Sequence, residues 1–171
     1  LLGTDGGHFR KWVLDGITAP PDNSILSCDF AAIGLGLPMG VGIGQFLKDR
    51  DRFVNGGEDR TAVTICGDAG FMMSIQELET AVRNDISVIV VVMNDSALGA
   101  EYHAIESRGW PPETALMSTP DFATIAEGMG AEAHTANSIK NVEALADHLQ
   151  DPDGPVVIDC TVNHEVRHRS Y

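Results

Sequence analysis

The sequence predicts an α/β fold, a doubly wound parallel sheet flanked by helices. Two observations support this prediction. Strand-like apolar runs alternate along the chain with segments of helical periodicity, and such alternation is typical of parallel sheets. One run, residues 87–93, is apolar at every position after Ser87, as expected for a central strand covered on both faces.

The expected strands are residues 24–27, 61–66, 87–93 and 155–162, each bounded by polar, glycine or proline residues. Two segments are expected to be loops. Residues 48–60 are charged and contain consecutive glycines, and residues 107–119 contain a pair of prolines. The second loop follows a presumed ligand-binding turn, so it either covers a site or is a surface connection.

Three helices are predicted from their first residues and apolar stripes. Ser74-Ile75-Gln76-Glu77 has the pattern of a capping box, and the stripe Ile75, Leu78, Ala81 and Val82 follows it. Thr119-Pro120 would begin a second helix, with proline in the first turn. Ser138 would open a third helix, striped by Val142, Leu145, Ala146 and Leu149.

Length, charge and cysteine content limit the classes of protein to which the chain can belong. The 171 residues fit a single domain, 1–171, and the net charge of −14 disfavours nucleic acid and anionic membranes as partners. Cys28, Cys66 and Cys160 lie far apart and are expected to be reduced thiols in a cytoplasmic protein. A membrane span is not expected, because no apolar stretch reaches about 18 residues. A start at Leu1 without methionine or signal pattern suggests the C-terminal part of a longer chain.

Two acids follow apolar strands and carry the functional prediction. Asp68 stands between glycines after the strand at 61–66, and Asp95 follows the strand at 87–93. Neighbouring parallel strands would bring both carboxylates to one sheet edge, where open α/β sheets bind ligands. Hard oxygen ligands beside glycine backbone suit Mg²⁺ and a diphosphate. Alternatives are a turn-forming acid, a non-catalytic phosphate-binding module, and a phosphatase or acylphosphate receiver with Asp68 as nucleophile.

The motifs that contain Asp68 and Asp95 also occur in a fixed order along the chain, with a helical motif between them. Gly67-Asp68-Ala69, then Glu77-Leu78-Glu79-Thr80-Ala81, then Asn94-Asp95 resemble the signature of the C-terminal diphosphate-binding domain of thiamine diphosphate enzymes. The chain is most similar to acetolactate synthase large subunits and related 2-oxo acid decarboxylases and lyases. The resemblance covers almost the whole chain and implies thiamine diphosphate and Mg²⁺ as cofactors.

By this resemblance, Asp68, Asp95 and the backbone carbonyl of Ala97 would coordinate Mg²⁺. Position 95 is often asparagine in relatives, and aspartate would hold the metal harder but repel the diphosphate. The resemblance places further cofactor contacts around the metal, at Gly67, Ala69, Gly70, Leu98 and Gly99. Gly67 and Gly70 would also permit a tight strand-to-helix turn.

Two more patches extend the resemblance. In residues 30–38, Ile33 takes the place of the apolar residue that bends the cofactor, and the Ala31 carbonyl would accept a hydrogen bond from its aminopyrimidine. The alternative is a glycine-rich entry to a buried helix. In Asp5-Gly6-Gly7-His8-Phe9, His8 replaces a diphosphate-contacting glutamine, or is a surface histidine at a helix start. The other five histidines show no metal-ligand spacing and are expected to be solvated or satisfied locally.

The implied activity is that of a transferase or lyase that decarboxylates a 2-oxo acid, with pyruvate expected, and then ligates or releases the carbanion or enamine. The activating glutamate of the family lies in a pyrimidine-binding domain, usually from a neighbouring subunit of a homodimer or tetramer. Because this chain has no such domain, its catalytic residue is unassigned and the isolated chain is expected to be inactive. The alternative is the small subunit of a split, sulfopyruvate-type decarboxylase.

Overall fold

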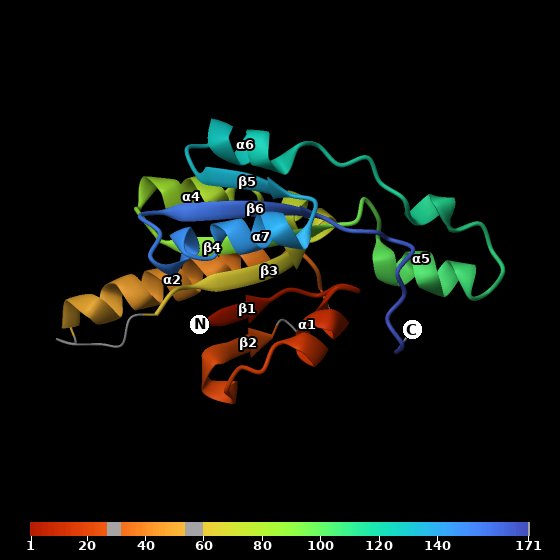
Figure 1. The fold of residues 1–171 in the computed structure, drawn as a ribbon, viewed down its shortest axis with the longest axis horizontal. Coiled ribbons are helices and arrows are strands. Elements are labelled where there is room, and N and C mark those ends of the chain that lie inside the picture. The colour runs from red at the N-terminus through yellow and green to blue at the C-terminus, as the bar shows by residue number, and fades with distance from the viewer. Residues whose placement is uncertain (27–31, 54–59, 171) are drawn as a thin grey trace.

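The computed structural model describes residues 1–26, 32–53 and 60–170. In these ranges strands and helices alternate along the chain, interrupted by three short 3₁₀ turns (Figure 1). The strands are β1 Leu2–Thr4, β2 Ser24–Leu26, β3 Val63–Gly67, β4 Val88–Asn94, β5 Glu132–Ala136 and β6 Pro155–Thr161. The helices are α1 Arg10–Gly16, α2 Gly36–Phe53, α3 Asp68–Ser74, α4 Glu77–Arg83, α5 Gly99–Glu106, α6 Phe122–Gly128 and α7 Ile139–Leu145. The 3₁₀ turns are η1 Pro21–Asn23, η2 Pro112–Ala115 and η3 His148–Gln150.

All strand pairs are parallel, and they form one sheet in the order β2-β1-β3-β4-β6-β5. This confirms the predicted α/β class. From β1 the chain moves outward to β2 and then returns to the other side of β1 as β3, so the winding direction reverses between β1 and β3. Such reversals open a crevice at the carboxyl ends of the strands, where α/β sheets bind ligands.

The central strand β4 packs against a core on each face of the sheet, as the apolar run at 87–93 indicated. Val88, Val90 and Val92 of β4 face one core, which contains apolar residues of α2, α3, α4 and α6. Ile89 packs in a second core on the other face, together with Val156 and Ile158 of β6 and Leu145 of α7. Alternate residues of one strand therefore pack into opposite cores.

Several predicted boundaries were wrong. Ser74 ends α3 and does not cap α4, and its hydroxyl bonds the Gly70 carbonyl within its own helix. Pro120 precedes α6, whose N-cap is Asp121, because the Asp121 carboxylate accepts the Thr124 N–H at 2.9 Å. The charged segment expected to be a loop from residue 48 is helical as far as Phe53.

Other boundaries agree with the sequence. Helix α7 begins directly after Ser138, and Leu78 and Ala81 of the predicted stripe are buried in the core. The segment after α5 includes η2 and pairs with the turn at residues 96–98, since Ala97 forms an antiparallel bridge with Leu116. The segment after α5 therefore supports the turn at residues 96–98.

Cys66 is a buried free thiol and Cys160 a partly buried one, whereas Cys28 lies outside the described residues. Burial, with a smaller effect of Asp159, raises the pKa of Cys160 to about 11. Of the helices in the described ranges, none has both the length and the hydropathy needed to cross a membrane.

Candidate functional site

A cavity of about 640 Å³ opens at the carboxyl ends of four adjacent strands, β1, β3, β4 and β6. Its lining includes every predicted site residue that the structure describes, namely His8, Ile33, Gly67, Asp68, Ala69, Gly70, Asp95, Ala97, Leu98 and Gly99. Ala31, the remaining predicted contact, lies outside the described residues. Chain segments far apart in the sequence are thus brought together at one sheet edge.

Asp68 lies on the floor of this cavity, directly after β3, and is 2% exposed. Its Oδ1 accepts the Ala69 N–H at 2.7 Å. Its Oδ2 is buried and has no well-formed hydrogen bond among the described residues. Burial raises the pKa of Asp68, and the amides of Ala69, Ser96 and Ala97 only partly offset this effect. A buried carboxylate oxygen without a partner is the kind of atom that a cation would satisfy.

Asp95 approaches from the neighbouring strand β4, where Gly67 pairs with Met93. Its Oδ1 accepts the Ala97 N–H at 3.1 Å. Burial first, and then the charge of Asp68, raise the pKa of Asp95 to about 6. Two carboxylates that repel each other in a partly buried site would both be stabilised by a divalent cation. The oxygen donors and their location therefore fit Mg²⁺.

The turn that carries Asp95 is fixed by polar contacts that the sequence did not reveal. Ser96 has a φ of 54°, in the left-handed region, and its hydroxyl lies 3.0 Å from that of Thr119. Thr119 also donates to the Asn94 side chain at 3.1 Å, and the Asn94 amide donates to Asp159 of β6 at 3.0 Å. This network holds Ser96 in a backbone conformation that few residues other than glycine adopt.

Asp5 is a second residue whose contribution the sequence motif did not show. It follows β1, is fully buried, and accepts three backbone N–H groups through its carboxylate. Oδ1 accepts those of Gly6 at 2.8 Å and Leu35 at 3.3 Å, and Oδ2 accepts that of Gly34 at 2.8 Å. Gly34 has a φ of +92°, which favours glycine. Asp5 therefore positions the turn that presents Ile33 to the cavity.

His8 lines the cavity next to Gly99, as Asp95 does, and is 7% exposed, so it is not a surface histidine. Its Nε2 accepts the backbone N–H of His168 at 3.2 Å, and its ring lies 4.7 Å from that of His103. Burial first, and then His103 and His168, lower the pKa of His8 to about 4. The ring is neutral near pH 7, and an accepting Nε2 leaves its proton on Nδ1.

The remaining histidines differ in part from expectation. His103 is 1% exposed and its ring nitrogens have no hydrogen-bond partner among the described residues, so it is neither solvated nor satisfied locally. His168 is 4% exposed and is satisfied locally, because its Nδ1 lies 2.7 Å from the Ser170 hydroxyl. His168 belongs to the C-terminal segment, where it contacts Asp15 at 3.1 Å and brings Val166 to the cavity wall. His134 and His148 lie elsewhere and share a carboxylate, Glu132.

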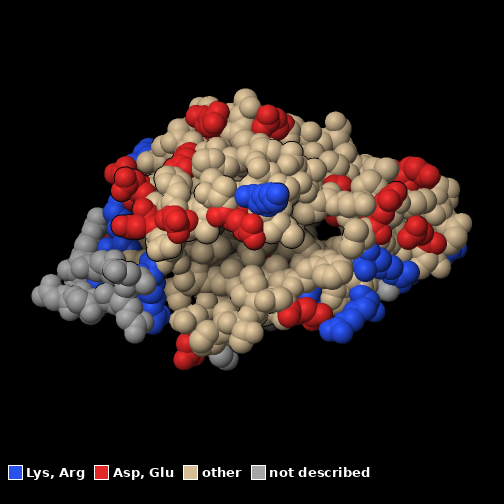
Figure 2. All heavy atoms as spheres, in the orientation of Figure 1, with Lys and Arg blue, Asp and Glu red and all other residues tan. Residues whose placement is uncertain are grey.

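Charge is unevenly distributed over the surface. In Figure 2, acidic side chains form several separate groups on the visible face, and Lys and Arg gather in a few places, one of them near α1 and the C-terminus. Arg10 of α1 is among the residues that line the cavity and carries a positive charge. An anionic ligand would need this charge or a metal ion to offset the net charge of the chain.

Fold and cavity together define an α/β domain with a glycine-lined, acid-bearing ligand site at a switch in strand order. Residues 5–160 match the family described as thiamine pyrophosphate enzyme, C-terminal TPP binding domain, and the chain belongs to this family. The resemblance seen in the sequence is thus confirmed.

Individual relatives agree with this assignment. The chain is 29% identical over 166 residues to the acetolactate synthase isozyme 2 large subunit of Escherichia coli, covering 95% of this chain and 28% of that protein. It is also 29% identical over 175 residues to the chloroplastic acetolactate synthase 1 of Zea mays, covering 96% of this chain and 26% of that protein. The chain thus spans little more than a quarter of the length of these relatives.

Solved structures share the fold. A protein from Mycobacterium smegmatis, assigned as a thiamin diphosphate-dependent enzyme, superposes with a TM-score of 0.72 at 26% identity, covering 94% of this chain and 28% of that one. Benzoylformate decarboxylase from Polynucleobacter necessarius has a TM-score of 0.83 at 21% identity, covering 98% and 30%. The second likeness concerns the fold alone.

Proposed function

We propose that this domain binds thiamine diphosphate with Mg²⁺ in the cavity and serves an acetolactate synthase-like enzyme that decarboxylates a 2-oxo acid, with pyruvate as the first substrate to test. One observation carries the proposal. The buried carboxylate of Asp68 and the partly buried one of Asp95 come from adjacent strands and meet in a glycine-lined cavity, and Asp68 Oδ2 has no hydrogen-bond partner among the described residues. This donor set suits a divalent cation bridged to a diphosphate.

In this proposal Asp68, Asp95 and the Ala97 carbonyl hold the metal. The backbone at Gly67, Ala69, Gly70, Leu98 and Gly99 lets a diphosphate approach closely, because most of these residues have small side chains. The Nδ1–H of neutral His8 is a donor suited to a phosphate oxygen. Ile33 presents an apolar side chain to the part of the ligand beyond the diphosphate, and the turn held by Asp5 fixes its position.

Bound thiamine diphosphate supplies the electron-accepting ring on which 2-oxo acids lose CO₂. The chain orients the cofactor and holds the metal that neutralises its charge. The described cavity walls contain no glutamate other than Glu101. We propose that the glutamate facing the cofactor comes from a pyrimidine-binding domain, usually from a neighbouring subunit of a dimer or tetramer. In this proposal, residues 1–171 are the C-terminal domain of a longer enzyme or a separate subunit of a split one.

Exposed apolar residues beside the cavity support such a partner domain. Met72 and Met73 of α3 are 46% and 62% exposed, and Leu35 is 44% exposed. Met73 lies close to the segment that contains Leu35, because a side chain at the neighbouring Gly34 would touch Met73. Clustered apolar side chains at the mouth of a ligand site are typical of surfaces that another domain covers.

The phosphoryl-transfer alternative finds less support. A receiver or phosphatase with Asp68 as nucleophile needs a lysine near the carboxyl ends of the strands. Lys48 instead donates to the carbonyls of Asn84 and Asp85, which precede β4 at the opposite end of the sheet. Lys11 and Lys140 belong to α1 and α7 and do not line the described cavity.

The test is calorimetric titration of thiamine diphosphate into the chain, with Mg²⁺ and then with EDTA. We expect binding only with the metal, and a loss of at least about tenfold in affinity in Asp68→Ala. Asp153→Ala, which removes an exposed acid, is the matched control. Unchanged affinity in a folded Asp68→Ala variant would reject the metal assignment.

A second measurement separates the metal site from the affinity that a partner domain adds. Mn²⁺ should broaden the amide NMR signals of Ala69 and Ala97, which flank the two acids, but not that of Leu47 near the end of α2, which lies toward the amino ends of the strands. If Mn²⁺ leaves Ala69 and Ala97 sharp and the wild-type chain binds no cofactor, the proposed function is wrong for this chain.

A further inference from the structure

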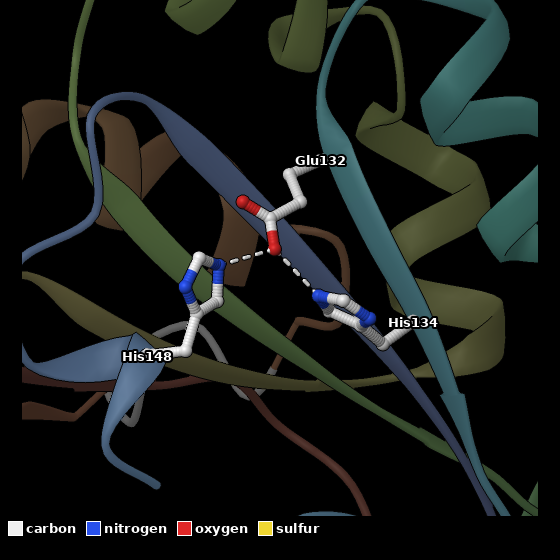
Figure 3. A group of neighbouring side chains, drawn as sticks. All are labelled: Glu132, His134 and His148. Atoms are coloured by element: carbon white, nitrogen blue, oxygen red, sulfur yellow. Dashed lines mark hydrogen bonds and ion pairs between the residues drawn. The ribbon is translucent and has the colours of Figure 1, made fainter. Parts of the chain in front are cut away.

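Glu132, His134 and His148 form a cluster away from the cavity. Glu132 and His134 lie two residues apart on β5, the edge strand, so their side chains leave the same face of the sheet. His148 reaches them from η3 (Figure 3). Glu132 pairs with Val156 near the start of β6, so the cluster lies toward the amino ends of the strands and the cavity lies at their carboxyl ends.

The three side chains converge on one point. Nε2 of His134 and Nε2 of His148 each lie 2.6 Å from the same oxygen, Oε1 of Glu132 (Figure 3). The potential ligand atoms of the three residues all lie within 4.8 Å of one another. Ligand atoms around a tetrahedral zinc ion lie about 3.3 Å apart. A small rotation of these partly exposed side chains would therefore reach coordination distances.

The donor types indicate which ion would bind. Two imidazoles and one carboxylate are the ligands of three-residue zinc sites, in which water takes the fourth position. Mg²⁺ prefers oxygen ligands, so it would not compete strongly here. The net charge of −14 also favours cation binding over an empty cluster.

We propose that Glu132, His134 and His148 bind one Zn²⁺, with water as the fourth ligand, and that the ion joins η3 to the edge strand β5. This site is separate from the cavity and does not depend on the proposed cofactor. Because the ligands come from two elements, binding should raise the thermal stability of the fold. It would also fix the position of the outermost strand.

The experiment is calorimetric titration of ZnCl₂ into the full chain with saturating Mg²⁺ present. We expect one bound Zn²⁺ per chain, and an affinity at least about tenfold weaker in His134→Ala and in His148→Ala. Glu143→Gln, which neutralises an exposed glutamate of α7, should bind as the wild type does. The His148 side chain is 56% exposed, so His148→Ala is expected to fold even if His134→Ala does not.

The alternative zinc site is the pair Asp68 and Asp95 in the cavity. The Asp68→Ala variant distinguishes that site from the proposed one on β5 and η3. Zinc binding retained in Asp68→Ala, with shifted Nε2 signals of His134 and His148 in ¹⁵N NMR, supports the proposal. No uptake by the wild type overturns it. Binding that survives in His148→Ala at wild-type affinity, or that is lost only in Asp68→Ala, also overturns it.

Discussion

The carboxylate of Asp5 accepts the backbone N–H of Gly34 at 2.8 Å, linking residues 29 positions apart in the sequence. The bond joins the residue after β1 to the turn before α2, the helix that connects β2 to β3. A side chain at Gly70 would meet Asp5 Oδ2 at 2.6 Å, so α3 packs against the same carboxylate. One buried acid thus connects three of the segments that form the cavity.

Asp5→Asn tests this connection. Both carboxylate oxygens accept backbone N–H groups, so an asparagine must direct its NH₂ group at one of these donors. We expect a loss of about 1–3 kcal/mol in the free energy of unfolding, measured by urea denaturation. Asp22→Asn, at an exposed position, should leave stability within about 0.5 kcal/mol of the wild type. Equal effects of the two substitutions would contradict the role of Asp5.

Gly40 and Gly42 of α2 should respond oppositely to alanine. A Cβ at Gly40 would lie 2.6 Å from Thr64 Cγ2 of β3, whereas a Cβ at Gly42 meets nothing within 4 Å. We expect Gly40→Ala to destabilise the fold by about 1–3 kcal/mol through overpacking. Gly42→Ala should stabilise it by about 0.5–1 kcal/mol, because alanine favours the helix. Urea denaturation measures both, and the same sign for the two would show that α2 packs differently on the sheet.

The sequence predicted the central part of the fold because burial leaves a clear pattern there. β4 is apolar on both faces, and β3 and β6 are apolar runs between turn residues, so each was predicted to within two residues. β1 has only three residues, and β5 reads Glu-Ala-His-Thr-Ala without an apolar face. Neither carries a strand pattern, because tertiary pairing and not composition makes them strands.

The cavity residues could be named in advance because they follow predicted strands, as Asp68 and Asp95 do. The contacts that shape the site could not be predicted from the sequence. The bonds from Asp5 to Gly34 and from Asn94 to Asp159 join residues with no fixed spacing, and only the fold brings them together. His134 and His148 show no metal-ligand spacing in the sequence for the same reason, since η3 returns to β5 only after α7.

Metal affinity should depend on pH through Asp95, whose pKa lies at about 6. Below that pH the carboxyl binds a proton and loses the charge that attracts a cation. We expect Mn²⁺ affinity at the cavity, measured by electron paramagnetic resonance, to fall about tenfold between pH 7 and pH 5. Asp95→Asn keeps an oxygen ligand without this titration, so its affinity should vary less over the range. Parallel curves for the two proteins would assign the pH dependence to another group.

Stability should depend on pH through His8. Its pKa is lowered from 6.5 to about 4 in the fold, so between these values the unfolded chain binds a proton that the native chain does not. His8 therefore makes the fold less stable as the pH falls from 6.5 to 4, and its effect is constant above and below that window. Asp95 acts in the opposite direction, because its raised pKa lets the native state bind the proton more readily.

His8→Gln separates the two effects, since it removes one titration and keeps a polar side chain beside Gly99. We expect the free energy of unfolding of His8→Gln, relative to the wild type, to rise steadily as the pH falls from 6.5 to 4, and to be constant above pH 6.5. Urea denaturation of both proteins across this range measures the difference, with the value at neutral pH as the internal reference. A difference that does not change with pH would mean that His8 has the same pKa in the native and the unfolded chain, and would contradict the lowered pKa of His8 in the fold.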